Sequence, residues 1–166
     1  TDFSAQLTSI KAKNPQAVFL PGYYTEVGLV VRQAKKLGLT VPFMGGDGWD
    51  SPRLIEIGGE ALNGSYYSNH FSVSDPSPAI QKFVSDYKAR YGETPDALAG
   101  LGFDAASILF DAIKRANSTD GAKIRDAIAQ TKDFPGVTGK ITLDKDRNAV
   151  KPAVVLQVKE GTLNYV

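Results

Sequence analysis

The segment Phe43-Met44-Gly45-Gly46-Asp47-Gly48-Trp49-Asp50 is the part of the sequence that most constrains the fold. An apolar run over residues 41–44 predicts a short strand, and three glycines then surround a single carboxylate, that of Asp47. Glycine allows the backbone to turn sharply and a ligand to approach it closely. In open α/β sheets, ligands bind beyond the carboxyl ends of the strands. The segment therefore predicts that Asp47 is the polar anchor of a small-molecule site.

A second predicted strand lies upstream and is followed by its own polar loop. Residues 17–20 are continuously apolar, as expected of a strand that is covered on both faces of a parallel sheet. The loop over residues 21–26 follows, and an amphipathic pattern over residues 27–37 predicts a helix. Short joins between strand, helix and strand predict a right-handed crossover and a parallel sheet. Tyr23 and Asp47 are therefore expected at the same edge of that sheet.

The rest of the chain predicts further helices and then β structure. A first helix is expected after Thr1 and Asp2, a short helix near residues 53–57, and an extended segment over residues 65–71. The segment Ser74-Asp75-Pro76-Ser77-Pro78 is interpreted as a crossover between lobes. Three helices are predicted in series after it, and the tail from residue 140 is predicted as strands with a hairpin at Glu160-Gly161.

Composition restricts the possible partners. The chain has 166 residues, of which 42% are hydrophobic and 22% charged, which suits one soluble globular unit. A formal net charge of +1 gives no electrostatic reason to expect nucleic acid or an acidic membrane surface. The absence of cysteine excludes disulfides and thiolate chemistry. No apolar run reaches about eighteen residues, so no direct membrane insertion is expected.

No motif predicts a cofactor or a metal. His70 is the only histidine, which leaves little material for a histidine-based metal site or a catalytic triad. Asp144-x-Asp146-x-Asn148 resembles the start of a calcium loop, but Ala149 and Val155 occupy the positions that need glycine and glutamate. The glycine segment at residues 45–48 lacks both the lysine of a P-loop and the spacing of a dinucleotide fingerprint.

The beginning of the chain is unusual for a doubly wound sheet. It opens on a predicted helix, and only two convincing parallel strands precede the crossover at residues 74–78. Two parallel strands are too few to cover both faces and would leave unpaired edges. We therefore expect the chain to be a piece of a larger protein.

Seven short segments of the chain occur in an order that is itself informative: Asp2-Phe3-Ser4, Gly22-Tyr23-Tyr24-Thr25-Glu26, Arg32-Gln33-Ala34, Gly45-Gly46-Asp47-Gly48, Tyr87-Lys88-Ala89-Arg90-Tyr91-Gly92, Phe103-Asp104-Ala105-Ala106 and Phe134-Pro135-Gly136-Val137-Thr138-Gly139-Lys140. In this order they resemble the C-terminal half of the periplasmic leucine/isoleucine/valine-type binding proteins, the amino-acid receptors of ABC importers. The resemblance covers essentially the whole chain and implies an α/β fold, with the parallel-sheet, Rossmann-like lobes of a type I periplasmic binding protein in a truncated chain.

The resemblance also implies a division into lobes. Residues 1–71 would be most of the second, ligand-binding lobe, without its first strand and helix. Residues 72–150 would be the returning part of the first lobe, and residues 151–166 the hinge crossover with the C-terminal strands. The first lobe's opening βα units, whose loops hold the ligand's carboxylate in this family, would be missing. The chain alone is therefore expected to bind ligand weakly.

The function implied by the resemblance is binding without chemistry. The ligand would be a branched-chain or related amino acid, the partner would be the membrane permease of an ABC importer, and no cofactor is implied. The location would be periplasmic or extracellular, with a membrane tether in a Gram-positive source. Tyr23 would contact the ligand and Asp47 would receive its α-ammonium group, with Gly22 and Gly46 beside them.

Three further residues are candidates for the same site. By resemblance, Leu98 near the start of the second long helix would border the side-chain pocket. Tyr24 and Trp49 are also candidates for ligand contact, but packing within the lobe or a place at the rim of a cleft is the favoured interpretation of both. Asp47 itself could simply form an Asx-turn or cap the following helix.

Other functions remain open on the sequence alone. One is a receiver-type signalling domain with Asp47 as phosphoacceptor, although no acidic pair follows an early strand and no late lysine is evident at a strand end. Another is an enzyme of a doubly wound family, which would need a nucleophile or base near Asp47. The last is a folded remnant or a domain-swapped dimer that is held together by unpaired sheet edges.

Overall fold

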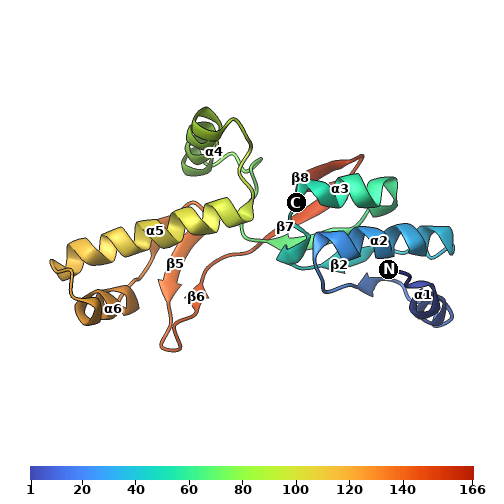
Figure 1. Cartoon of the computed structure of the whole chain (residues 1–166), viewed down its shortest axis with the longest axis horizontal. Helices are drawn as coiled ribbons and strands as arrows, with labels where there is room; N and C mark the ends of the chain where they lie inside the picture. The colour runs from blue at the N-terminus through green and yellow to red at the C-terminus, as the bar shows by residue number, and fades with distance from the viewer. The chain divides into compact units, whose positions relative to one another are not determined.

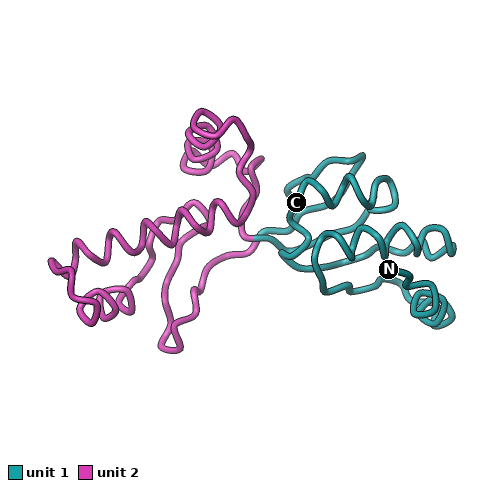
Figure 2. The backbone as a smooth tube through the Cα atoms, viewed as in Figure 1, with its two compact units in different colours: residues 1–69, 154–166 teal, residues 70–153 magenta.

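The computed structural model describes residues 1–166, and they form two compact units. Unit 1 comprises Thr1–Asn69 with Val154–Val166, and unit 2 comprises His70–Ala153, as Figure 2 shows by colour. The chain therefore passes from one unit to the other at residues 69–70 and returns at residues 153–154. These divisions lie a few residues from the lobe boundaries predicted at 71/72 and 150/151, and the C-terminal strands pack with unit 1.

Unit 1 is built on a five-stranded sheet in the order β1-β2-β3-β7-β8 (Figure 1). The β1–β2 and β2–β3 pairs are parallel, as predicted for the first two strands, whereas β7 runs antiparallel to both of its neighbours. The strands are β1 (Val18–Phe19), β2 (Phe43–Gly45), β3 (Tyr66–Asn69), β7 (Val154–Lys159) and β8 (Thr162–Tyr165). The helical elements are α1 (Ser4–Lys11), α2 (Tyr24–Lys36), η1 (Asp47–Trp49), α3 (Pro52–Gly58) and η2 (Gly59–Leu62).

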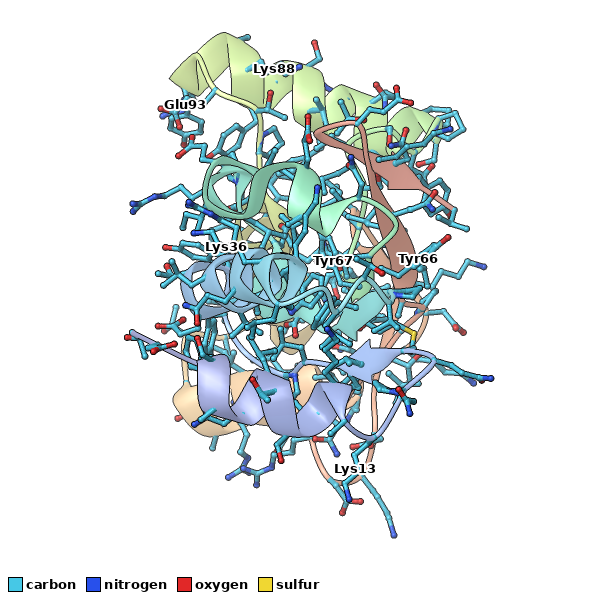
Figure 3. The ribbon with its side chains drawn as sticks, turned by 90° about the vertical axis from the view of Figure 1, so that its right-hand side faces the viewer. Lys13, Lys36, Tyr66, Tyr67, Lys88 and Glu93 are labelled. Carbon is cyan, nitrogen blue, oxygen red and sulfur yellow. The ribbon has the colours of Figure 1, made fainter.

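The two faces of this sheet differ in burial. Phe43, Tyr67 and Leu156 point to the face covered by helices and belong to the core, in which the apolar stripe of α2 also lies. The neighbouring strand residues point the other way, because side chains alternate along a strand. Figure 3 shows this at β3, where Tyr67 lies on the helix side of the sheet and Tyr66 on the opposite side. The sheet thus has one packed face and one open face.

Unit 2 consists of three helices and a small antiparallel sheet in the order β4-β5-β6 (Figure 1). Each helix begins at a residue whose side chain accepts a backbone N–H: Ser77, Asp96 and Asp120. Such caps satisfy donors that have no partner in the first turn. The elements are α4 (Pro78–Tyr91), α5 (Ala97–Ala116), α6 (Gly121–Ala129), β4 (Phe134–Gly136), β5 (Gly139–Leu143) and β6 (Ala149–Val150). None of the helices in the structure combines the length and apolar character that crossing a bilayer requires.

Candidate ligand-binding site

The two loops singled out in the sequence lie against each other in unit 1. Val18 pairs with Phe43 in the parallel β1–β2 ladder, so the two strands end at the same edge of the sheet. A β-carbon on Gly48 would lie 2.6 Å from the carbonyl oxygen of Gly22 and 3.2 Å from a ring carbon of Tyr23. Only glycine allows so close an approach of the two loops. The predicted convergence of the Tyr23 and Asp47 loops is therefore observed in the backbone.

A pocket of about 280 Å³ opens between these loops. This volume is close to the lower limit of the roughly 300–1,000 Å³ that is typical of small-molecule sites. Asp47 is the one charged side chain in its lining, and it is exposed, as is Tyr23. The lining residues are Phe19, Pro21, Gly22, Tyr23, Gly46, Asp47 and Gly48. A pocket with a single carboxylate and an aromatic ring suits a small cation that carries an apolar group.

Trp49 supports the Asp47 loop from beneath instead of lining the pocket. Its side chain is completely buried, and its indole N–H donates to the carbonyl oxygen of Leu20 at 3.1 Å, at the end of β1. A β-carbon on Gly45 would collide with the indole ring, so the glycine makes room for it. Trp49, a candidate for ligand contact, thus packs within the lobe in this structure, which is the alternative that the sequence also offered.

A second buried aromatic residue holds the same loop from β3. The Tyr67 ring lies 5.8 Å from the Trp49 ring between centroids, and its hydroxyl donates to Oδ1 of Asp50 at 3.1 Å. Burial, reinforced by the negative charge of Asp50, raises the pKa of Tyr67 far above its usual value. The phenol therefore remains a neutral donor, and it fixes the end of the loop that carries Asp47.

Of the other four residues predicted for the site, two line the pocket and two lie elsewhere. Gly22 and Gly46 line the pocket, and Gly46 has open space around the position of a β-carbon. Tyr24 is partly buried against the core of unit 1 at the first residue of α2. Leu98 lies in α5 of unit 2 and is 74% exposed, so it does not belong to the pocket that unit 1 forms by itself.

Sequence reasoning missed two residues that line the pocket, Phe19 and Pro21. Phe19 ends β1 and is 66% exposed, because its side chain points to the open face of the sheet. The strand itself was predicted from the sequence. The alternation of its side chains places Phe19 on the opposite face of the sheet from Val18. Only the pairing of β1 with β2 shows that this face is open next to Asp47.

Comparison with known proteins identifies the family of this chain. Residues 1–162 match the periplasmic binding protein family. The chain belongs to this family. The leucine binding protein LivK of Thermotoga maritima is 44% identical in sequence, with a TM-score of 0.92 over 99% of this chain and 47% of that protein. The branched-chain amino acid transporter substrate binding protein LivJ of Streptococcus pneumoniae, solved with isoleucine, is 34% identical, with a TM-score of 0.89 over 99% and 48% of the two chains.

A curated relative supports the same family assignment by sequence similarity alone. The Leu/Ile/Val-binding protein homolog 1 of Brucella suis is 30% identical over 171 residues, which is 99% of this chain and 45% of the relative. The chain thus spans about half the length of the relatives that it matches. Its α/β fold is that of about half of a type I periplasmic binding protein, as the resemblance implied. Membership assigns the chain to solute-binding proteins rather than to enzymes or receiver domains, and the family is extracytoplasmic.

Proposed function

We propose that the pocket of unit 1 binds the ammonium group and part of the side chain of an amino acid, branched-chain or related. The observation that carries this proposal is the meeting of the Tyr23 and Asp47 loops around a pocket with one negative charge. The Asp47 carboxylate would accept hydrogen bonds from the ammonium, each stabilising the complex by about 1.5–3 kcal/mol. The Tyr23 ring would pack against the same cationic group.

The wider role proposed for the parent protein is that of a receptor for an ABC importer. Support comes from the relatives, one of which is named a leucine binding protein and another of which was solved with isoleucine. The ligand would bridge two lobes, and its higher affinity for the closed form would favour closure. The partner would be the membrane permease of the importer. The protein would act in the periplasm, or outside the cell with a membrane tether in a Gram-positive source.

A second copy of this chain is a further proposed partner. Strands β1 and β8 are the edges of the unit 1 sheet, and the backbone groups of an edge strand can pair with another chain. For the 166-residue chain studied alone, we therefore propose a weak dimer through these edges.

The ligand proposal can be tested on this chain with two fragments of leucine. One fragment, 3-methylbutan-1-amine, keeps the amine, and the other, 4-methylpentanoate, keeps the carboxylate. We expect the amine to shift the NMR resonances of residues 22–23 and 46–48, and the acid to leave them unchanged. Asp47→Asn should weaken binding of the amine roughly 10- to 100-fold, because a charge-assisted hydrogen bond is lost.

The matched control is Asp86→Asn, which removes an exposed carboxylate of α4 that pairs with Lys82. This variant should bind the amine as the unsubstituted chain does. If Asp47→Asn retained the affinity of the unsubstituted chain, Asp47 would not be the ammonium acceptor. If the acid bound and the amine did not, the polarity assigned to the pocket would be wrong.

A further inference from the structure

Two of the seven segments that carry the resemblance, residues 103–106 and residues 134–140, meet inside unit 2, which contributes no residue to the proposed ligand pocket. Asp104 of α5 is 2% exposed, and its carboxylate accepts hydrogen bonds from the backbone N–H groups of Val137 at 2.7 Å and Thr138 at 2.8 Å. It also accepts the hydroxyl of Thr138 at 2.7 Å. A β-carbon on Gly136 would lie 2.6 Å from this carboxylate. The loop over residues 136–138 is therefore fixed on α5.

Lys151 connects this fixed loop to both segments that link the units. Its ammonium group donates to the carbonyl oxygen of Thr138 at 3.3 Å and to that of His70 at 3.4 Å. His70 is the first residue of unit 2, and Lys151 lies close to its last residue, Ala153. The outgoing and returning segments are thus joined through one side chain, on a loop that Asp104 holds in place.

Unit 1 holds the same two segments by a different means. Asn69 pairs with Val154 at the last position of the antiparallel β3–β7 ladder. The backbone between the two attachments is then the Asn69–His70 peptide on one segment and residues 152–153 on the other. Pro152 fixes its own φ and restricts the preceding Lys151 to extended conformations. Few rotatable bonds therefore remain, and hinges in proteins are typically a few such residues.

We propose that Lys151 is a positioning residue of a hinge. Its ammonium group keeps the two linking segments together on unit 2, so that rotation between the units is confined to the bonds of Asn69–His70 and Pro152–Ala153. This inference concerns neither the ligand nor the residues of the proposed pocket. Its test therefore needs no ligand, and it can fail or succeed independently of the proposed function.

The absence of cysteine makes a spin-label experiment direct. Labels are attached at Lys36→Cys in α2 and Lys114→Cys in α5, both at exposed positions, and the distribution of distances between them is measured by pulsed electron paramagnetic resonance. Adding Lys151→Met should broaden this distribution about twofold, because the linking segments gain rotatable backbone. Adding Lys145→Met, in an exposed turn of the same unit, should leave it unchanged.

A second pair of labels separates hinge motion from damage to unit 2. The pair Lys88→Cys and Lys114→Cys reports on α4 against α5 within that unit, where Phe83 and Phe103 pack at 5.0 Å. Its distribution should be the same in all variants. The proposal is overturned if Lys151→Met leaves the distribution between the units unchanged. It is also overturned if this variant broadens both pairs alike, since the lysine would then act only on the folding of unit 2.

Discussion

At the scale of single residues, three neighbouring glycine positions meet different demands. Gly45 makes room for the buried indole of Trp49, and Gly48 lets its loop touch the carbonyl oxygen of Gly22. Gly46 has open space within 4 Å of the point where a β-carbon would stand, and an extended φ of −112°, which any residue can adopt. The close approach of the loops therefore depends on Gly48, whereas Gly46 leaves space at the mouth of the pocket.

The pair Gly48→Ala and Gly46→Ala tests this difference. In Gly48→Ala, the new methyl group would be forced against the Gly22 carbonyl, and such overpacking should lower the free energy of unfolding by about 1–3 kcal/mol. Gly46→Ala should change that free energy by less than about 0.5 kcal/mol, as at an ordinary surface position. Urea unfolding followed by circular dichroism measures both. Equal stabilities for the two variants would contradict the close loop contact.

At the scale of elements, strand β3 and turn η1 pack against each other beneath the pocket. Tyr67 of β3 packs on Trp49 of η1 and donates to Asp50, the residue that follows the turn. This arrangement connects the third strand of the sheet to the loop that carries Asp47. The orientation of the loop therefore depends on a partly buried hydrogen bond to a charged group.

Tyr67→Phe tests this support and predicts a pH dependence. Loss of a hydrogen bond to a charged group should lower the free energy of unfolding by about 1.5–3 kcal/mol at neutral pH. Because the pKa of Tyr67 is raised in the folded chain, its contribution is complete below the unfolded pKa of about 10 and is lost as pH rises above that value. Stability measured by urea unfolding should thus fall less steeply above about pH 10 in the variant. An identical decline in both chains would contradict the assignment.

The elements that could be predicted from the sequence are those that depend on residues close together in the chain. The apolar stripe of α2, and the hairpin turn at Glu160-Gly161 with positive φ at both residues, follow from neighbours in the chain. Strand β4 was missed, because its Phe-Pro-Gly sequence resembles a loop and becomes a strand only by pairing with β5. The burial of Trp49 was left undecided for a similar reason, since its hydrogen bond reaches Leu20, 29 positions away.

At the scale of the whole molecule, the open face of the unit 1 sheet is an exposed apolar surface. Phe19, Met44 and Val155 are 66%, 41% and 43% exposed, and all three point to this face. Parallel sheets are normally covered on both faces. An exposed apolar face of this kind favours association, in addition to the unpaired strand edges.

A double variant, Phe19→Ser with Val155→Ser, tests whether this face takes part in self-association. Burying one such apolar side chain stabilises an interface by about 1.5–3 kcal/mol, so the dissociation constant of a dimer should rise at least about tenfold. Sedimentation velocity over a range of concentrations measures it. Val73→Ser, at an exposed valine of unit 2, is the control. If the unsubstituted chain is purely monomeric, or if the dissociation constant of the dimer is the same in the double variant, this face has no role in self-association.

The burial of Trp49 has a practical consequence for studying the protein. Because this is the only tryptophan in the chain, all indole fluorescence originates directly beneath the candidate pocket. Its emission should be blue-shifted in the native chain and move to the red when the loop detaches from the sheet. The molecule thus carries an intrinsic optical probe, with which events at its recognition loops can be followed without any attached dye.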